Sequence, residues 1–472
     1  MATPLTNTLY LGTFIHSKTL TELEYLHSTA IAVDASGTIV AIEPYTPEDN
    51  ITTTLPTRLG WGASFTTIHA KPDGSQFFFP GFVDTHLHAP QYPNVGLFGA
   101  STLLDWLNTY TFPLEASMAD LRRARPVYSR VIRKTLAHGT TAAAYYATLD
   151  VGATNLLADL CLAAGQRALV GRVCMDSELS PGYYRDASVE EAVRLTRESV
   201  EYIEGVDPAG ELVRPVVTPR FAPSCTAGLL AALGDMVRER PGVMVQTHIS
   251  ENKGEVELVR ELFPGVGSYA EVYDVHGLLT ERTILAHAVH LTEGEVELVA
   301  RRGAKVSHCP CSNSAITSGA ARVRWLLEKG VVCGLGTDMS GGYSASVLEA
   351  ARQAVLVSRH VSLEEGIGGE GVKLSVEEVL YLATRGGAEV IGLGVKVGAF
   401  EVGREWDAQL VGLGVVDGEG GVSEGGTDGE EGGVDVFGWE SWEEKVAKWV
   451  FNGDDRNTRR VWVRGRLVHE RK

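Results

Sequence analysis

The chain has few of the features that mark membrane, secreted or disulfide-rich proteins. Its 472 residues include no uninterrupted apolar run near the roughly 20 residues that a membrane helix needs. The segment 1–5 lacks the basic and apolar regions of a secretory signal. The six cysteines are scattered, mostly within apolar stretches, which indicates reduced thiols. We therefore expect a cytoplasmic protein without a membrane partner.

Basic residues are also in short supply. The chain has 42 Lys and Arg against 60 Asp and Glu, which gives a formal net charge of −18. A surface of this sign repels phosphate backbones and anionic lipids over most of the molecule. We therefore expect neither a nucleic-acid nor a membrane partner.

What the sequence does contain is a repeating pattern in its middle. Hydrophobic residues make up 44% of the chain, and short β-branched runs alternate with longer amphipathic stretches, which is typical of parallel strands joined by crossover helices. We predict eight strands, at 79–86, 140–148, 168–176, 212–220, 243–249, 283–288, 304–309 and 331–337. Eight such units predict an α/β fold with a (β/α)8 barrel of the TIM type.

The two ends of the chain have a different pattern. Short alternating segments with turn residues at 30–42 and 461–468 predict hairpins. We expect 1–78 and 395–472 to build one small β-sandwich beside a barrel at 79–394. The segment 412–433 is rich in Gly, Glu and Asp and poor in residues that can pack, so we predict a disordered surface insertion there.

Two histidines, His86 and His88, lie at the end of the first predicted strand. Residues two apart on a strand point to the same face, so both imidazoles project into the mouth of the barrel and can share a metal ion. Alone the pattern is weak, because His-x-His pairs are often incidental. Its position strengthens it, since active sites of such barrels lie at the C-terminal ends of the strands.

Three further residues of metal-ligand type end later strands: His248, His287 and Asp338. Each has an ordinary alternative, a satisfied core histidine for the first two and a helix N-cap for Asp338. Because four strands end in such residues, we favour a metal site. These nitrogen and oxygen donors suit zinc, or iron, and an open position on the metal produces hydroxide from water at neutral pH.

Glu251 is the candidate for a proton shuttle. It follows His248 by three residues and turns from the strand end into the next loop. The alternative is a solvated glutamate that opens a helix at 251–262, where a carboxylate is stabilised by the helix dipole.

These residues and their flanks resemble the amidohydrolase superfamily, in its aminohydrolase branch. The motifs that carry the resemblance are Pro80-Gly81-Phe82-Val83-Asp84-Thr85-His86-Leu87-His88, His248-Ile249-Ser250-Glu251, His287, Ser307-His308-Cys309-Pro310 and Gly336-Thr337-Asp338. Within the branch, the chain is most similar to the guanine-deaminating members, through His88-Ala89-Pro90-Gln91-Tyr92, Thr111-Phe112-Pro113-Leu114-Glu115 and Thr218-Pro219-Arg220-Phe221. The resemblance covers nearly the whole chain and fails at 412–433.

The resemblance implies a single zinc ion, with iron as the alternative. Its ligands would be His86, His88, His248 and Asp338. His287 would orient the water or ligate weakly, so the implied catalytic residues are Glu251, Asp338 and His287. Arg220 argues against a second metal, because two-metal relatives offer a lysine at the end of the fourth strand.

The resemblance also implies a purine pocket lined by Gln91, Arg220 and Phe221, with His88, His248, Glu251 and Asp338 touching the substrate as well. An arginine can donate to a purine carbonyl, and an aromatic ring covers a base face. The hypothesis is hydrolytic deamination of guanine to xanthine and ammonia. Asp338 would deprotonate the metal-bound water, the hydroxide would attack C2, and Glu251 would protonate N3. A homodimer is implied in the same way.

Three alternatives remain open. Another aminohydrolase of the branch, acting on adenine-type nucleosides, cytosine or a triazine, would share the metal residues and differ around Gln91, Arg220 and Phe221. A non-catalytic scaffold on the same barrel would be expected to lose ligands, whereas this chain keeps them. The acidic segment 412–433 could also bind another protein alongside catalysis.

Overall fold

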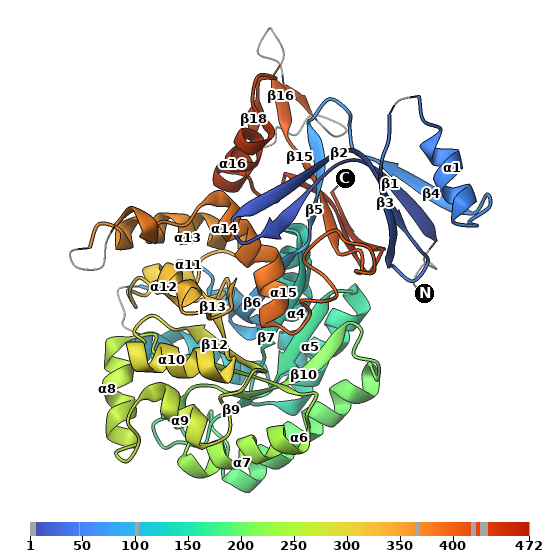
Figure 1. The fold of residues 1–472 in the computed structure, drawn as a ribbon. Helices are drawn as coiled ribbons and strands as arrows, with labels where there is room; N and C mark the ends of the chain where they lie inside the picture. Colours follow the sequence, from blue (N-terminus) through green and yellow to red (C-terminus); the bar gives the residue numbers. More distant parts are fainter. Residues whose placement is uncertain are drawn as a thin grey trace.

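The computed structural model describes residues 6–46, 48–99, 103–364, 369–416, 422–424 and 433–471. These residues form a strand-and-helix barrel and, beside it, a β-sheet built from both ends of the chain (Figure 1). The barrel fills the lower part of the figure, and the sheet of the termini lies above it.

The barrel contains the eight predicted parallel strands. In sheet order β14-β13-β12-β11-β10-β8-β7-β6 they are paired edge to edge, and β9 pairs with β10 as a continuation of β8. The ends of this order also meet, because Asp338 N donates to His86 O at 2.8 Å and His88 N donates to Met339 O at 2.9 Å. The strands are β6 (Phe82–His88), β7 (Thr140–Tyr146), β8 (Arg167–Gly171), β9 (Val173–Cys174), β10 (Val213–Pro219), β11 (Met244–Ile249), β12 (Thr283–His287), β13 (Lys305–His308) and β14 (Cys333–Leu335).

Helices cover the outside of the barrel (Figure 1). Several begin after a side chain that accepts a free backbone N–H of the first helical turn, such as Asp150, Ser188 and Thr226, which explains where these helices start. The longer ones are α4 (Leu121–Ala137), α5 (Val151–Ala164), α6 (Val189–Val206), α7 (Ala227–Glu239), α8 (Lys253–Leu262), α9 (Tyr269–Val275), α10 (Glu293–Arg302) and α13 (Val347–Val361). The shorter ones are α2 (Leu103–Trp106), α3 (Phe112–Ser117), α11 (Pro310–Ala315), α12 (Val323–Glu328), α14 (Val376–Tyr381) and α15 (Gly387–Val390).

The predicted first strand, 79–86, is wrong as a single element. The structure breaks it at Pro80-Gly81 into β5 (Gln76–Pro80), which belongs to the sheet of the termini, and β6, which belongs to the barrel. Proline cannot donate to a sheet, and Gly81 lies so close to Thr141 that a Cβ there would be 2.2 Å from its side chain. The chain therefore passes from one sheet to the other at this dipeptide.

The two ends of the chain meet in one sheet of order β20-β19-β15-β5-β1-β2-β3, with β4 paired to β1. The predicted hairpins at 30–42 and 461–468 correspond to the antiparallel pairs β2–β3 and β19–β20. The members are β1 (Asn7–Thr19), β2 (Glu22–Val33), β3 (Ile39–Pro44), β4 (Phe65–His69), β15 (Ala408–Gly412), β19 (Thr458–Val463) and β20 (Arg466–Glu470), with α1 (Ile51–Arg58) beside them.

This sheet curls over its own aromatic core. Tyr10 of β1 and Trp462 of β19 are three strand steps apart in the sheet order, which in a flat sheet would be about 14 Å. Their ring centroids are instead 5.5 Å apart. Both rings are buried, together with Trp406, which stacks on Tyr10. The two halves of the sheet therefore face each other across one core, as the layers of a sandwich do.

The predicted disordered insertion at 412–433 is wrong for part of its length. Gly412 ends β15, and β16 (Gly414–Val416), β17 (Val422–Glu424) and β18 (Asp435–Val436) form a three-stranded sheet followed by α16 (Trp442–Asn452). Gly412, Leu413 and Gly414 are buried, so this stretch packs despite its composition. The remainder, 417–421 and 425–432, lies outside the described residues.

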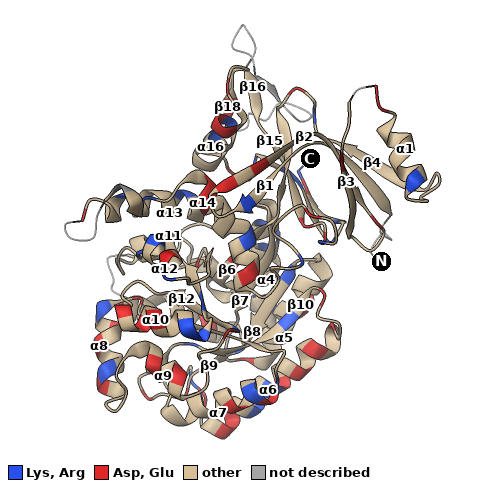
Figure 2. Ribbon diagram, in the orientation of Figure 1, with Lys and Arg blue, Asp and Glu red and all other residues tan. Residues whose placement is uncertain are grey.

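Charged residues lie mainly on the outer helices, and Figure 2 shows Asp and Glu spread over α6, α7 and α9. The strands of the barrel are almost free of them, and β7 and β11 are buried along their whole length. Among the described residues, no helix is both long enough and apolar enough to cross a bilayer.

Candidate active site

The sequence-predicted polar residues come together at the C-terminal ends of the barrel strands. His86 and His88 end β6, His248 lies in β11, and His287 is the last residue of β12. Asp338 follows β14 by three residues. All five are buried, with exposed fractions of 8% or less. Parallel strands bring their carboxyl ends to one edge, which explains how residues 250 positions apart become neighbours.

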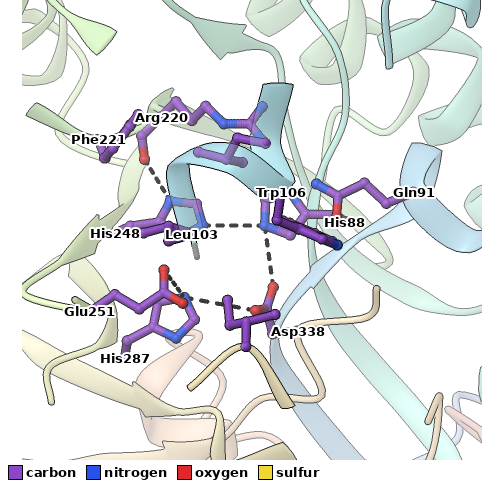
Figure 3. A pocket seen from close by; sticks show the side chains of 12 residues that line it. His88, Gln91, Leu103, Trp106, Arg220, Phe221, His248, Glu251, His287 and Asp338 are labelled. Carbon is purple, nitrogen blue, oxygen red and sulfur yellow. Dashed lines mark hydrogen bonds and ion pairs between the residues drawn. The ribbon is translucent and has the colours of Figure 1, made fainter. Parts of the chain in front are cut away.

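The donor atoms of this group lie close together, and Figure 3 shows four of the five residues, His88, His248, His287 and Asp338, around one point. Asp338 Oδ1 is 3.1 Å from His86 Nε2 and 3.4 Å from His88 Nε2. His88 Nε2 is 3.2 Å from His248 Nε2. Donors that each sit 2.0–2.2 Å from one tetrahedral ion are about 3.4 Å apart. Two overlapping triads, His86 with His88 and Asp338 and His86 with His248 and His287, therefore have the spacing of metal ligands.

Hydrogen bonds set the tautomers that metal binding needs. His248 Nδ1 lies 2.6 Å from the carbonyl of Arg220, so Nδ1 carries the proton and Nε2 presents its lone pair. His287 Nδ1 is bonded to Asn313 Oδ1 at 2.9 Å in the same manner. Its Nε2 is buried and has no hydrogen-bond partner among the described residues. Outer partners of this kind orient ligating histidines in metal sites, so the cluster fits a divalent metal ion.

Burial favours the neutral form of three of the imidazoles, whereas Glu251 and Asp338 outweigh burial at His287 and raise its pKa. Burial lowers the pKa of His86 and holds those of His88 and His248 well below their ordinary value. Neutral imidazole is the form that binds a metal. The backbone contributes strain at the same place, because His287 and Asp338 both have positive φ, at 74° and 44°. Left-handed backbone at such residues costs about 1–3 kcal/mol and gathers at functional sites.

The pKa values of two carboxyl groups in the site are shifted in opposite directions. Burial raises the pKa of Glu251 to about 7, opposed by His287 and assisted by the charge of Asp338. Burial also disfavours ionisation of Asp338, but the neighbouring His86 and His287 lower its pKa to about 2. His287 Nε2 lies between the two carboxylates, 3.5 Å from Glu251 and 3.8 Å from Asp338. One group is thus poised to exchange a proton while the other stays ionised.

A pocket of about 370 Å³ opens onto this group. One wall carries polar residues of the candidate metal cluster, and the other carries the three predicted purine-pocket residues, Gln91, Arg220 and Phe221 (Figure 3). Sequence reasoning missed the apolar lining, which is Leu103, Trp106, Leu107 and Ile316. Leu103, Trp106 and Leu107 lie in an irregular helical segment, and Ile316 follows α11. Nothing in the sequence distinguishes these apolar residues from those of the core.

Glu115 of α3 was also missed as a site residue, although its motif was noted. It is fully buried and forms an ion pair with Arg220, with Nη1 at 2.6 Å and Nη2 at 3.1 Å. Gln91 Nε2 donates to it at 2.7 Å. Arg220 therefore forms a buried ion pair with Glu115 and also lines the pocket. The signal was a glutamate that follows the apolar residues Phe112-Pro113-Leu114.

Sequence relatives match almost the full length of the chain. It is 46% identical over 464 residues to a probable guanine deaminase of Schizosaccharomyces pombe, a match that covers 98% of this chain and 83% of the relative. It is 38% identical over 460 residues to the guanine deaminase of Homo sapiens, with 98% and 96% covered.

Comparison with solved structures also finds a guanine deaminase. The crystal structure of guanine deaminase from C. acetobutylicum, with guanine bound in its active site, superposes with a TM-score of 0.84 at 29% identity, covering 98% of this chain and 100% of the other. The sequence profile of the Amidohydrolase family matches residues 77–468. With a metal-binding cluster at the strand ends and this match over most of its length, the chain belongs to the amidohydrolase family.

Proposed function

We propose that this chain hydrolyses guanine to xanthine and ammonia. The observation that carries the proposal is the composition of one pocket, in which Arg220 and Gln91 face a wall made of Glu251, His287 and Asp338. Groups that can recognise a purine edge thus lie opposite groups that can move protons and hold a metal. The relatives named guanine deaminase support the choice of substrate.

Recognition of the base falls to three side chains. The Arg220 guanidinium can donate to the C6 carbonyl of guanine, and the Gln91 amide lies beside it. Phe221 covers a face of the ring, with Trp106 among the other apolar residues of the lining. We also assign substrate contacts to His88, His248, Glu251 and Asp338, which line the same pocket.

We propose zinc as the metal, with iron as the alternative. His86, His88, His248 and Asp338 would hold it, and the nitrogen and oxygen donors of this set are those zinc prefers. Zinc supplies Lewis-acid chemistry and lowers the pKa of a water molecule. We assign to His287 the orientation of that water or weak ligation of the metal. The nearness of its Nε2 to Asp338 and Glu251, and the bond of its Nδ1 to Asn313, support this assignment.

The carboxyl groups move the protons. Asp338, with its pKa of about 2, is ionised and accepts the proton of the attacking water. Glu251, with its pKa of about 7, protonates N3 of the purine as the water oxygen bonds to C2. Glu251 then takes the proton of the C2 hydroxyl, which becomes the carbonyl of xanthine, and passes it to the amine as the C2–N bond breaks and ammonia leaves. The proton held by Asp338 returns to Glu251, which restores both carboxyl groups.

The test compares purine and non-purine substrates. Purified, zinc-loaded protein is mixed with guanine, adenosine, cytosine or a triazine, and the loss of ultraviolet absorbance and the release of ammonia are followed. We expect kcat/KM for guanine to exceed the others at least about a hundredfold, since a site built to hydrogen-bond one edge rejects mismatched edges strongly. A His86→Ala protein is the matched inactive control. Turnover of adenosine or cytosine without turnover of guanine would overturn the proposal.

Two properties outside the site are part of the proposal. All six cysteines are buried and unpaired, which supports a reducing compartment such as the cytoplasm. The family resemblance supports a homodimer. Size-exclusion chromatography with light scattering measures the mass of the protein in solution and so tests this oligomeric state.

A further inference from the structure

Glu115 connects three side chains that come from distant parts of the chain. Its Oε1 accepts from Gln91 Nε2 at 2.7 Å and from Arg220 Nη2 at 3.1 Å. Its Oε2 accepts from Arg220 Nη1 at 2.6 Å and from the Tyr184 hydroxyl at 2.8 Å. A carboxylate offers about four acceptor positions, and all four are used here. Glu115 does not line the pocket itself, so it acts through its neighbours.

The carboxylate decides which way the Gln91 amide is turned. Oxygen and nitrogen of an amide can exchange places by a flip, but an ionised carboxylate can only accept a hydrogen bond. Gln91 must therefore direct its Nε2 at Glu115. Its Oε1 is turned away from Glu115 and lies 3.3 Å from the hydroxyl of Ser340. Because Gln91 is only 1% exposed, solvent can do little to stabilise the flipped orientation.

The same carboxylate fixes the plane of the Arg220 guanidinium. Two parallel N–H groups are bound to Glu115 in a bidentate pair, which sets both position and orientation. The Phe112 ring, 5.0 Å from Arg220 Cζ, packs against the guanidinium. Arg220 thus presents only donors to the pocket, next to a Gln91 whose oxygen is an acceptor.

We propose that Glu115 is a positioning residue that determines specificity, which deepens and rests on the proposed function. It holds an acceptor on Gln91 beside the donors of Arg220. This pattern matches a purine ring edge on which an N–H adjoins a C=O. It does not match an edge on which an unprotonated ring nitrogen adjoins an amino group. Guanine has the first edge, and 2,6-diaminopurine has the second at the same size and with the same 2-amino group.

The experiment measures kcat/KM for guanine and for 2,6-diaminopurine in the zinc-loaded wild type and in Glu115→Gln. The glutamine can donate as well as accept, so Gln91 can turn over and offer its Nε2 to the pocket. We expect the ratio of kcat/KM for guanine to kcat/KM for 2,6-diaminopurine to fall at least about tenfold in Glu115→Gln. Most of the change should be a loss of kcat/KM for guanine, and the metal content should not change. The matched control is Glu378→Gln, which removes another buried carboxylate from an arginine, Arg324, away from the pocket. It should keep the wild-type ratio.

Tyr184→Phe is the second variant, in case Glu115→Gln does not fold. It removes one of the four hydrogen bonds of Glu115 and leaves the carboxylate in place. We expect the ratio to fall in the same direction, by about threefold. An unchanged ratio in the folded variants, or an equal loss for both substrates, would overturn this inference alone. A wild type that does not turn over guanine would overturn the proposed function and this inference with it.

Discussion

Three polar side chains of the pocket are each oriented by a hydrogen bond to a second residue. His248 is oriented by the Arg220 carbonyl, His287 by Asn313 and Gln91 by Glu115. The strand-end pattern of the sequence predicts His248 and His287 as members of the site. Their partners could not be predicted, because each is a contact between distant segments: Asn313 is 26 residues from His287.

Glu251→Gln tests the proton shuttle at the residue scale. Because the amide cannot protonate N3 or relay a proton to the leaving amine, we expect kcat for guanine to fall by ~10²–10⁴. KM and bound metal should change little, since Glu251 is not among the candidate ligands. Steady-state kinetics and metal analysis measure these quantities. Glu257→Gln, on the exposed face of α8, is the control. A variant within threefold of the wild-type kcat would rule out this role.

Asn313→Ala tests the orientation of His287. Without the amide oxygen, the His287 ring loses the bond that fixes its tautomer. Loss of such an outer partner typically costs about 10–100-fold in activity or metal affinity, so we expect kcat/KM for guanine to fall within that range. Ser314→Ala changes an exposed neighbour on α11 and should have no effect. Equal activity of the two variants would contradict the assignment.

At the scale of elements, the barrel was more predictable than its junctions. All eight barrel strands were recognisable as apolar, β-branched runs. The break at Pro80-Gly81 was not, because the aromatic run of β5 continues directly into β6. The three-stranded sheet around β16 was missed for the opposite reason. Its Gly-rich composition indicates disorder, and only its packing against the rest of the chain shows that part of it is ordered.

A buried ion pair joins the two sheets. Arg167 at the start of β8 makes a two-point contact with Asp407, just before β15, at 2.8 and 2.9 Å. Both side chains are almost fully buried. Asp407→Ala leaves the guanidinium without its main partner, so we expect the free energy of unfolding to fall by about 3–5 kcal/mol. Denaturant titration measures the change. Glu470→Ala removes the exposed pair with Arg460 and should cost at most about 1 kcal/mol. Similar losses in both variants would contradict the prediction.

For the whole molecule, burial of neutral histidines predicts sensitivity to acid. Burial lowers the pKa of His308, at the end of β13, to about 3. The unfolded chain takes up this proton near pH 6.5, so the contribution to stability is complete above that pH. It is lost as the pH falls toward 3, at up to about 1.4 kcal/mol per pH unit.

Unfolding free energies measured between pH 7 and pH 4 test this effect. We expect His308→Gln to show a shallower decline than the wild type, because the glutamine does not titrate. His360→Gln, at an exposed position of α13, should keep the wild-type slope. A His308→Gln slope equal to that of the wild type would show that this histidine does not carry the effect.

The most direct measurement follows oxygen from water into the product. Zinc-loaded protein is incubated with guanine in water enriched in oxygen-18, and the product is analysed by mass spectrometry together with the released ammonia. Hydrolysis at C2 predicts xanthine that carries one labelled oxygen, with one ammonia for each guanine consumed. Failure to form xanthine, or xanthine without the label, would contradict the assignment of this chain as a hydrolytic guanine deaminase.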